Sequence, residues 1–574
     1  MIFNLVHRAN TRPVYKWQRD VGHSLGFRIT VFIQNDLYDN EEVVKTCLYD
    51  RDTYGDEIGI WLTPDEKAGG PVTWLVSEKE KERMVKEAVD GYIRIFGEPP
   101  KVIGNYVLDS SLIRIIKEYC PSVVTVVAGC FEEGVKVFHG CNNSWYLFSE
   151  GMSWNPWYPS KGHSVRPAAD ENDWSGVVAV PHLSRDLVFA YESRNDFFAS
   201  HPANVQRGLG NEGAIHAYDF NLCDQYRMQE DFNDGFSYYQ THVGSNWLSH
   251  SINVIDPDEI TQQIYFETLK YIADLRDEGQ VTSLTLSEFG EEYKRIMPIK
   301  KQSVALGKDI LMGSGKQYYW VYDPSYRVLI DIFQGGSIGD LRPYASKYDA
   351  FTGVDAPKGR YLMNSYPYLI QSQYRTGMKN HWFDGSRTTL LMKHGEETLD
   401  MCTFNTKVED VTRTETSSTL TLSPVDVVFD DGLSMKVQTV YTFGENGRID
   451  ITRKITDMSD ESAEVSLTEY VKGCYGFTEY PEDMKGIGLY IDGQLVHTYD
   501  YSTTEKIKAG GKTLAVTIPE ITAEMTLEAI TEADSVSIRD GHLFEPYYLM
   551  QINYTANSKT KEVRSCLQIK KTAE

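Results

Sequence analysis

Carboxylate side chains stand directly after two short apolar runs in the first half of the sequence. Asp109 ends the segment Asn-Tyr-Val-Leu-Asp, and Glu288 ends Thr-Leu-Ser-Glu. Glycosyl transfer requires two carboxyl groups, one as nucleophile or base and the other as acid. We predict Glu288 as the proton donor, with Asp224 as the second candidate. The structural alternatives are that Asp109 caps a helix starting at Ser110, and that Glu288 is a surface residue of the helix that follows it.

Other polar and aromatic residues also close the apolar runs or follow them closely. They are His7, Arg8, Asp36, Trp61, His182, Arg185 and Asp186. We expect His7, Asp36 and His182 to bind the hydroxyl groups of a substrate. His7 could instead be a core histidine with satisfied hydrogen bonds, and the polar turn around Asp36 favours a structural role.

The segment Ser144–Lys161 is rich in aromatic residues and also holds proline and glycine. Four tryptophans lie in it or shortly after it: Trp145, Trp154, Trp157 and Trp174. Such rings suit stacking on sugar faces, although a long loop also needs a small core of its own. Three basic residues at the end of the segment could hold a carboxylate, sulfate or phosphate: Lys161, His163 and Arg166.

These residues depend on strands and helices that alternate along the first half. The pattern predicts strands at residues 2–7, 28–34, 57–62, 101–107, 123–128, 177–182 and 281–286. It predicts helices between them at residues 13–25, 41–49, 77–96, 110–119 and 257–278. Repeated strand–helix units favour a parallel sheet buried on both faces, open or closed into a barrel. The carboxyl ends of such strands meet at one rim, where α/β proteins build their sites.

Beyond about residue 300 the pattern changes to alternating runs that are typical of strands. Asn446-Gly447 and Asp492-Gly493 each lie between two such runs, which predicts β-hairpins. We predict a barrel domain at residues 1–298, with long loops at 129–175 and 183–255, and a β-sandwich at 299–574. The sandwich either binds carbohydrate, completes the cleft or only adds stability.

Composition limits the partners of this chain. Its 574 residues carry a net charge of −25, which disfavours nucleic acid and anionic membranes, and a polyanionic ligand would need a local basic pocket. The eight cysteines contain no Cys-x-x-Cys pair, and no signal peptide or apolar transmembrane run is visible, so we expect reduced thiols and a cytoplasmic location. A secreted or periplasmic location would require a signal that has been removed. No glycine-rich phosphate loop follows a strand, so we expect no nucleotide cofactor.

One short motif carries a family resemblance. Gly55-Asp-Glu-Ile-Gly-Ile-Trp61 resembles the Gly-His-Glu-Ile-Gly-x-His-Thr segment of polysaccharide deacetylases, with Asp56 and Trp61 in place of its metal-binding histidines. With the order of strands, residues 1–296 resemble the seven-stranded (β/α) barrels of the glycoside hydrolase/deacetylase superfamily, which includes glycoside hydrolase families 38 and 57. The whole chain is similar to uncharacterised glycoside hydrolases of gut bacteria.

The resemblance implies a site as well as a fold. Hydrolases of this superfamily place a carboxylate nucleophile after the fourth strand, where this chain has Asp109, and Trp61 would then be a sugar platform. We therefore predict a glycoside hydrolase that acts on an oligosaccharide by a retaining mechanism, without a metal or other cofactor. One alternative is a metal-dependent carbohydrate deacetylase with the metal set His7, Asp36, Asp109 and His182. The other is a non-catalytic glycan-binding protein.

Overall fold

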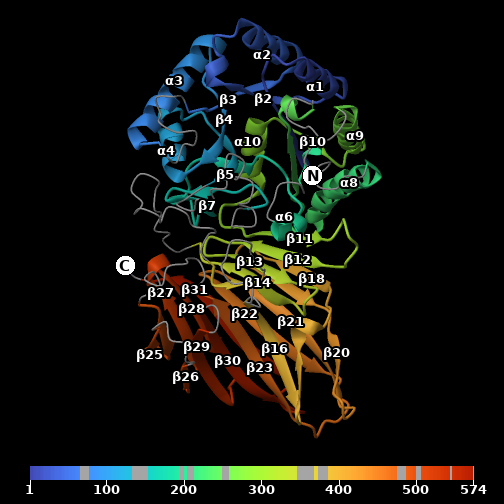
Figure 1. The fold of residues 1–574 in the computed structure, drawn as a ribbon, viewed down its shortest axis with the longest axis vertical. Helices are drawn as coiled ribbons and strands as arrows, with labels where there is room; N and C mark the ends of the chain where they lie inside the picture. Colours follow the sequence, from blue (N-terminus) through green and yellow to red (C-terminus); the bar gives the residue numbers. More distant parts are fainter. Residues whose placement is uncertain are drawn as a thin grey trace. The chain divides into compact units, whose positions relative to one another are not determined.

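The computed structural model describes most of the chain. The described residues are 1–64, 76–131, 153–193, 199–202, 212–248, 258–344, 368–372, 386–474, 486–499, 506–542 and 546–572. The chain divides into two compact units. The first holds residues 1–300 with two short later segments, and the second holds most of the remainder. Figure 1 shows α-helices and strands mixed in the first unit, whereas the described part of the second is made of strands with a few short 3₁₀ turns.

A parallel sheet forms the centre of the first unit, in agreement with the predicted fold class. In its described part, seven strands follow the order β9-β1-β2-β3-β4-β5-β8. Their bounds are β1 (Ile2–Arg8), β2 (Thr30–Gln34), β3 (Glu57–Trp61), β4 (Val102–Leu108), β5 (Thr125–Phe131), β8 (Val178–Pro181) and β9 (Tyr238–His242). This arrangement is a β/α half-barrel, with one end of every strand at a common rim.

The last strand of the half-barrel differs from the prediction. β9 pairs with β1 over Ile2–Val6, whereas β10 (Thr282–Ser283) pairs only with Ile2 and Phe3. The predicted strand at residues 281–286 is therefore a two-residue bridge at the amino end of β1. The true partner, Tyr-Tyr-Gln-Thr-His, lies inside the predicted loop 183–255. All five residues of β9 are buried, although three of them are polar. The segment therefore shows neither the alternation of a half-buried strand nor the apolar run of a buried one, and its sequence did not predict a strand.

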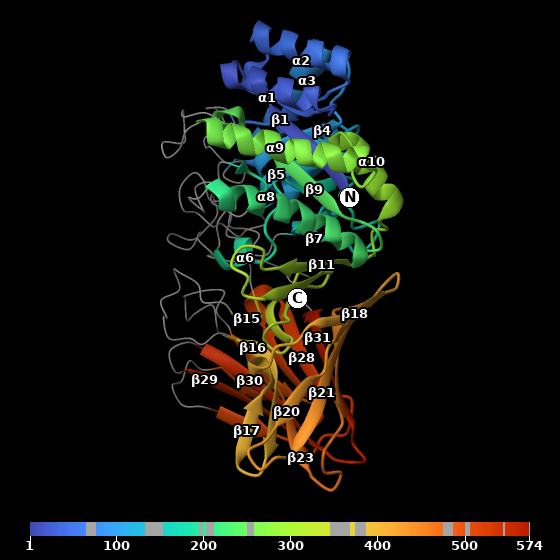
Figure 2. The same ribbon diagram turned by 90° about the vertical axis from the view of Figure 1, so that its right-hand side faces the viewer.

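Predicted helices appear with local signals that explain their ends. They are α1 (Pro13–Ser24), α2 (Glu41–Tyr54), α3 (Glu78–Phe96), α4 (Ser110–Tyr119) and α9 (Asp258–Asp277). The Ser77 side chain accepts a hydrogen bond from the Glu80 N–H at the start of α3, and the left-handed Gly97 ends that helix. In Figure 1, α2 and α3 lie outside β2 and β3, and in Figure 2 α9 and α8 (Glu212–Arg227) lie beside β9.

Helix α10 (Leu286–Ile296) covers the amino ends of the strands. Its first residue donates from its backbone N–H to Thr30 Oγ1 at 2.9 Å, and accepts at its carbonyl from Thr125 Oγ1 at 2.9 Å. Thr30 and Thr125 begin β2 and β5. Leu286 and Phe289 pack in the same core as the strand residues that line the barrel interior. The barrel is therefore filled from this end, and its opposite, carboxyl end is where a site can form.

Side chains complete the barrel wall between β8 and β9. Gln240 Nε2 donates to the carbonyl oxygens of Pro181 at 3.2 Å and His182 at 3.0 Å, and the Gln240 N–H donates to Ser184 Oγ at 2.9 Å. The free edge of β8 also forms an antiparallel bridge with Trp157 through Ala179. The wall on this side is thus closed by an amide side chain instead of a continuous ladder.

Antiparallel sheets make up the second unit. One sheet contains β11 (Ser303–Lys308), β12 (Gln317–Tyr322), β13 (Arg327–Asp331), β14 (Ser337–Arg342) and β15 (Ile370–Gln371). The next, in spatial order, contains β17 (Glu397–Asp400), β16 (Arg387–His394), β23 (Val465–Cys474), β30 (Pro546–Ala556), β29 (Ser535–His542) and β26 (Lys506–Ala509). The third contains β18 (Val408–Arg413), β19 (Ser418–Leu422), β21 (Ser434–Phe443), β22 (Arg448–Thr456), β31 (Glu562–Lys571), β28 (Ala523–Ala529), β27 (Thr513–Ile518), β24 (Gly488–Ile491) and β25 (Gln494–Thr498), with β20 (Val425–Val428) beside β21.

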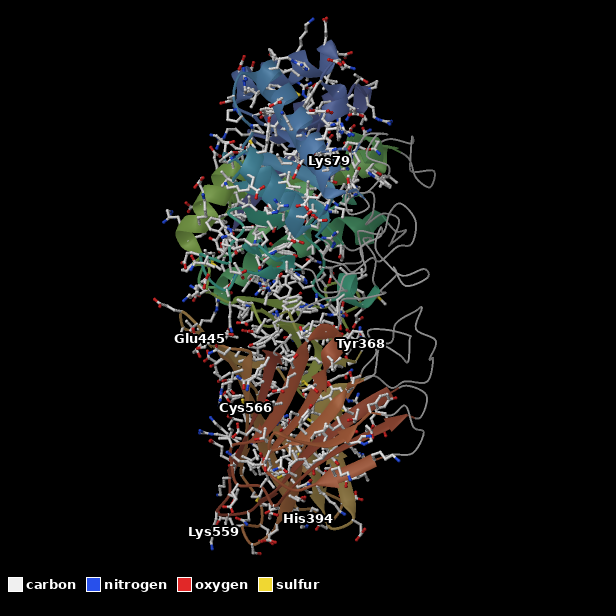
Figure 3. The ribbon with its side chains drawn as sticks, turned by 90° about the vertical axis from the view of Figure 1, so that its left-hand side faces the viewer. Lys79, Tyr368, His394, Glu445, Lys559 and Cys566 are labelled. Atoms are coloured by element: carbon white, nitrogen blue, oxygen red, sulfur yellow. The ribbon has the colours of Figure 1, made fainter. Side chains whose placement is uncertain are left out.

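Turn chemistry and buried charge pairs define this unit. Both predicted hairpins are confirmed: Asn446-Gly447 joins β21 to β22 and Asp492-Gly493 joins β24 to β25, all with positive φ. A buried ion pair links two of the sheets, since Arg453 on β22 donates to Glu469 on β23 at 2.8 and 3.0 Å. His394, which is labelled in Figure 3, ends β16. Its Nε2 lies 3.0 Å from Asp431 Oδ2.

Candidate functional site

Strand alternation decides which side chains line the carboxyl end of the barrel. Val6, Phe32, Val127, Val180 and Tyr238 belong to one core, so they mark the inward face of their strands. Further along the same faces come Arg8, two residues after Val6, His182, two residues after Val180, and His242, four residues after Tyr238. Trp61 on β3 and Tyr106 on β4 join them. We call Arg8, Trp61, Tyr106, His182 and His242 the mouth cluster.

The mouth cluster is held together by ring contacts and one cation. The Arg8 guanidinium carbon lies 4.9 Å from the centre of the Trp61 ring and 5.0 Å from that of Tyr106, and Arg8 Nη1 donates to the Tyr106 hydroxyl. Trp61 meets Tyr106 edge-on at 5.2 Å and His242 at 5.3 Å between ring centres. His182 and His242 lie 5.9 Å apart, also edge-on. Five strands therefore contribute to one packed polar and aromatic surface.

Solvent reaches one of the two large rings. Tyr106 is 43% exposed, whereas Trp61 is 1% exposed beneath it. The Trp61 ring occupies space left by Gly104, because a Cβ atom there would lie 2.5 Å from the indole. The expectation that Trp61 itself is an open platform is therefore wrong, and Tyr106 is the ring that a sugar could reach.

The two histidines of the mouth cluster are neutral near pH 7. Burial lowers the pKa of His182 well below 6.5, and nearby Arg185 lowers it further. Burial likewise lowers the pKa of His242, followed by the charge of Arg8. Neither ring nitrogen of His242 has a hydrogen-bond partner among the described residues. A neutral imidazole in this state can accept one hydrogen bond and donate another to a ligand.

His7 faces away from the mouth. Its Nε2 lies 2.6 Å from the hydroxyl of Tyr265 on α9, and its ring packs edge-on against Tyr15 on α1. Burial lowers the pKa of His7 to about 3. Because neighbouring residues of a strand point to opposite faces, Arg8 lies inside the barrel and His7 between sheet and helices. The prediction that His7 binds substrate hydroxyls is wrong, and the core alternative holds.

Asp109 lies at the predicted end of β4, where it caps α4. Its Oδ1 accepts from the Leu112 N–H at 2.8 Å, and its Oδ2 accepts from Lys81 Nζ at 2.6 Å. Lys81 also donates to Ser111 Oγ at 2.8 Å. The capping alternative is thus confirmed, and a nucleophilic role for Asp109 stays a prediction.

Glu288 lies at the opposite end of the barrel from Asp109. It completes a capping box with Thr285 and pairs with Arg28 at 2.6 Å through both oxygens. Burial tends to raise its pKa, but hydrogen bonds from Arg28 and Thr285 outweigh burial and lower it. A proton donor needs a raised pKa. The predicted rim position is wrong, because the short β10 pairs with the start of β1 and not with its end.

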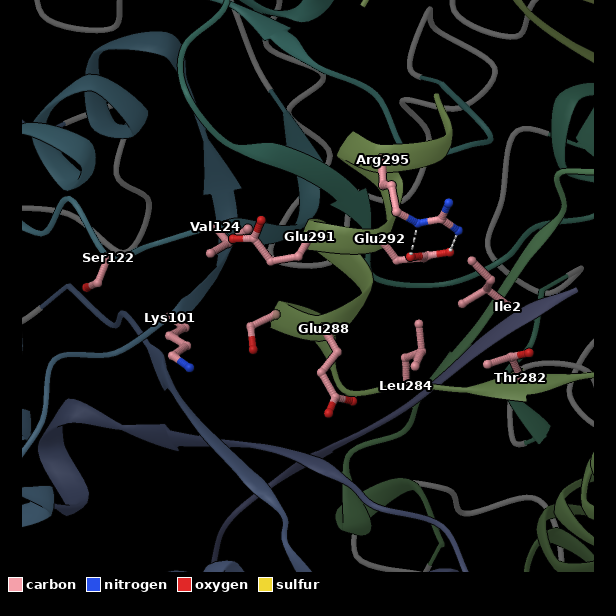
Figure 4. A pocket seen from close by; sticks show the side chains of 11 residues that line it. Ile2, Lys101, Ser122, Val124, Thr282, Leu284, Glu288, Glu291, Glu292 and Arg295 are labelled. Atoms are coloured by element: carbon pink, nitrogen blue, oxygen red, sulfur yellow. Dashed lines mark hydrogen bonds and ion pairs between the residues drawn. The ribbon is translucent and has the colours of Figure 1, made fainter. Parts of the chain in front are cut away.

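Glu288 lines a different pocket, of about 750 Å³, at the amino ends of the strands (Figure 4). Lys101, Ser122 and Val124 face it from the starts of β4 and β5. Its other acidic residues are paired with basic residues of the same helix, Glu292 with Arg295 and Glu291 with Lys294. These are ordinary surface ion pairs, and they do not converge on a ligand position.

Asp224 and Asp186 have structural positions. Asp224 lies on α8, where it accepts from Tyr271 of α9 at 2.8 Å and from Arg227, so this part of the predicted loop 183–255 is a helix. Asp186 accepts from the Val188 and Phe189 N–H groups at 2.8 Å, at the start of α6 (Phe189–Ser193). The hydroxyl of Tyr218 also donates to Asp186, whose pKa burial raises to about 6.

The remaining predicted residues lie outside the mouth cluster. Arg185 is buried beside it and donates to the Leu183 carbonyl, and Asp36 is exposed in a short 3₁₀ turn (Asn35–Leu37) after β2. Trp154 and Trp157 are buried, and Trp157 Nε1 donates to the Ser164 carbonyl at 2.9 Å. The aromatic segment after residue 152 is thus a small core, not an open stacking surface.

The basic residues of that segment have local partners. Lys161 is exposed and donates from Nζ to the carbonyl of Asn172 at 2.6 Å. Arg166 pairs with Asp173 at 3.1 Å. His163 is buried, which lowers its pKa to about 3. Trp145 lies outside the described residues.

The predicted metal set is not brought together. His7 lies on the outer face, Asp109 is paired with Lys81, and Asp36 is exposed, so His182 alone of the four faces the mouth. Within the described ranges, no three His, Cys, Asp or Glu residues form a group that could hold a metal ion. None of the described helices is both long and apolar enough to cross a membrane.

One protein-family model matches the chain, and the match covers most of the first unit. Residues 27–305 match one family model, described as a domain of unknown function with a solved structure, DUF3863. No curated protein sequence matches the chain. The matched range contains β2 to β5, β8 and β9, so it includes every strand of the half-barrel except β1.

Similar solved structures are distant. A 4-α-glucanotransferase from Thermococcus litoralis shares 9% identity, with 99% of each chain covered and a TM-score of 0.29. A galactose mutarotase-like protein from Clostridium acetobutylicum shares 10% identity over 46% of this chain and 98% of its own, with a TM-score of 0.31. A protein assigned as a polysaccharide deacetylase from Mycobacterium smegmatis shares 10% identity over 52% of this chain and 92% of its own, with a TM-score of 0.28. Similarity at this level does not specify an activity.

Two residues of the mouth cluster were missed by sequence reasoning. Tyr106 stands three residues before Asp109 in a strand that was correctly placed, and inward alternation from Val102 would have identified it. His242 ends β9, which was not predicted at all. Arg8, Trp61 and His182 were predicted at the rim, and the structure brings these three together.

Proposed function

We propose that the barrel mouth binds a carbohydrate and that the protein is a glycoside hydrolase acting at this site. The observation that carries the proposal is the mouth cluster itself, with the exposed Tyr106 ring over Trp61 and with polar atoms of Arg8 and His242 beside it. Sugars are bound by such combinations, because ring C–H groups stack on aromatic faces while hydroxyls take hydrogen bonds.

Hydrolysis requires proton transfer in addition to binding. His182 and His242 are neutral by virtue of burial and could accept or relay a proton. Asp109 remains the proposed nucleophile on the resemblance alone, and its Oδ2 accepts a hydrogen bond from Lys81. In this proposal the leaving group receives its proton from a residue other than Glu288 or Asp224, because neither lies at the mouth.

A second candidate function is glycan binding without turnover. It is favoured by the state of Asp109, both of whose oxygens are engaged in the cap and the ion pair. In addition, none of the five residues of the mouth cluster is a carboxylate. The two candidates share one binding site and differ in whether the bound sugar is cleaved.

The test combines binding and turnover on a panel of oligosaccharides and aryl glycosides. We expect Tyr106→Ala to weaken binding about tenfold, the loss expected when roughly 1.4 kcal/mol of stacking is removed. Tyr49→Ala is the matched control, because Tyr49 is a comparably exposed tyrosine on α2. Equal binding by wild type, Tyr106→Ala and Tyr49→Ala would refute the mouth as the site.

Asp109→Asn separates the two candidates. Asparagine caps helices about as well as aspartate, so the variant is expected to fold. Loss of a clear wild-type turnover with binding retained would support hydrolysis through Asp109. Saturable binding without turnover in the wild type would favour the glycan-binding candidate.

A further inference from the structure

Arg8 is bonded differently from a typical buried arginine of this protein. Arg453 in the second unit donates to the carboxylate of Glu469 through two nitrogens. Arg8 instead donates to a phenol, that of Tyr106, and lies over the Trp61 ring. Its Nε is buried without a hydrogen-bond partner, and the contacts of its guanidinium among the described residues are with Tyr106 and Trp61. A guanidinium in this setting has unused capacity for an anion.

Among the described residues, the charged groups that act on the two histidines of the mouth cluster are the arginines Arg8 and Arg185. The groups that act electrostatically on His242 are Arg8, His7 and His201. Those that act on His182 are Arg185, His242, Arg8 and His201. None of these groups is acidic, although acidic residues exceed basic ones in the chain by 82 to 57. In its described part, the mouth cluster thus carries the positive charge of Arg8 in an otherwise acidic protein.

We propose that the sugar bound at the mouth carries an anionic group, a carboxylate, sulfate or phosphate, which binds to Arg8. This inference rests on the proposed function, since it names the substrate class of the same site. The Tyr106 hydroxyl accepts from Arg8 Nη1 and so orients the guanidinium group, while the exposed Tyr106 ring can stack on the sugar ring. In this arrangement the anionic group and the sugar ring are bound side by side. Both ring nitrogens of His242 are buried without a hydrogen-bond partner among the described residues, so a hydroxyl group or the anion that enters beside them would satisfy one.

The experiment measures binding of the full chain to a glycan array that holds neutral, uronic-acid, sulfated and phosphorylated oligosaccharides. We expect the wild type to prefer one of the anionic classes over the neutral glycan of matching backbone. We expect Arg8→Gln to weaken binding of that anionic glycan at least about tenfold, the loss of a charge-assisted fork, and to change neutral binding much less. The class that binds identifies the source of the charge.

Arg28→Gln is the matched control. Arg28 is an arginine of the same unit that pairs with Glu288 at the opposite end of the barrel, partly exposed to solvent. The control is expected to bind like the wild type. If Arg8→Gln does not fold, the salt dependence of wild-type binding decides: anionic binding should weaken at least about threefold between 50 and 500 mM NaCl, as screening requires.

Different outcomes overturn different statements. A wild type that binds neutral glycans as well as anionic ones, with no effect of salt, overturns the anionic inference and leaves the carbohydrate site standing. An Arg8→Gln variant that retains anionic preference also overturns it. Absence of binding to every glycan class overturns the proposed function together with the inference.

Discussion

At the scale of single residues, Asp219 couples the stability of the first unit to pH. This residue of α8 is buried, its Oδ2 accepts from the Thr268 hydroxyl, and its Oδ1 has no hydrogen-bond partner among the described residues. Burial raises its pKa from 3.8 to about 7. The folded protein therefore keeps a proton that the unfolded chain releases near pH 4. The stability contributed by this proton is complete below pH 4 and is lost as the pH rises to about 7.

We predict that Asp219→Asn stabilises the protein above pH 7, by up to about 4 kcal/mol in the free energy of unfolding. Below pH 4 the variant and the wild type should be nearly equal, since both are then uncharged at this position. The measurement is the difference in unfolding free energy between the two proteins from pH 4 to pH 8. A difference that does not change with pH would contradict the buried, protonated state.

At the scale of elements, the packing of β3 against β4 determines where the Trp61 ring lies in the mouth cluster. Gly104 on β4 leaves room for the Trp61 ring of β3, and a Cβ atom at this position would meet two ring carbons at 2.5 and 2.6 Å. Trp61 in turn supports Arg8 and Tyr106. The absence of a Cβ atom at Gly104 therefore allows the Trp61 ring to lie where it contacts Arg8 of β1 and Tyr106 of β4.

We predict that Gly104→Ala destabilises the first unit by about 1–3 kcal/mol, the usual cost of overpacking a filled core. It should also displace Trp61 and weaken ligand binding at the mouth. Thermal unfolding and binding of the same glycan measure the two effects. Gly162→Ala is the matched control, because a Cβ atom there has open space within 4 Å, and a similar loss in both variants would contradict the argument.

At the scale of the whole molecule, the net charge is negative, whereas Arg8 in the mouth cluster is positive. The chain carries −25, so its negative groups repel one another in the compact state. We predict that raising NaCl from 20 to 500 mM increases the melting temperature by roughly 2–4 °C, which corresponds to about 1 kcal/mol in a domain of ordinary size. Binding of an anionic glycan should move in the opposite direction. A melting temperature that falls with salt would show that favourable ion pairs dominate instead.

The sequence by itself determined the local elements of this protein and the broad fold class. Six of the seven predicted strands are found, because runs such as Val123–Ala128 and helix N-caps such as Ser77 encode strands and helix starts within a few residues. The two predicted hairpins are found because Asn-Gly and Asp-Gly tolerate positive φ. The rim residues Arg8, Trp61 and His182 could be named because they close such runs.

Only the tertiary structure decided which strand completes the barrel and which side chains face its interior. β9 pairs with β1 across more than 230 residues of sequence. Because β9 and not the segment before Glu288 extends along β1, His242 lies at the mouth and Glu288 lies at the amino end of the barrel. The face of each strand was equally undetermined: His7 and Arg8 are neighbours, yet one lies in the core and the other over Trp61. The physical reason is that a strand buried on both faces carries no polar alternation, so its inward side is defined only by the residues packed against it.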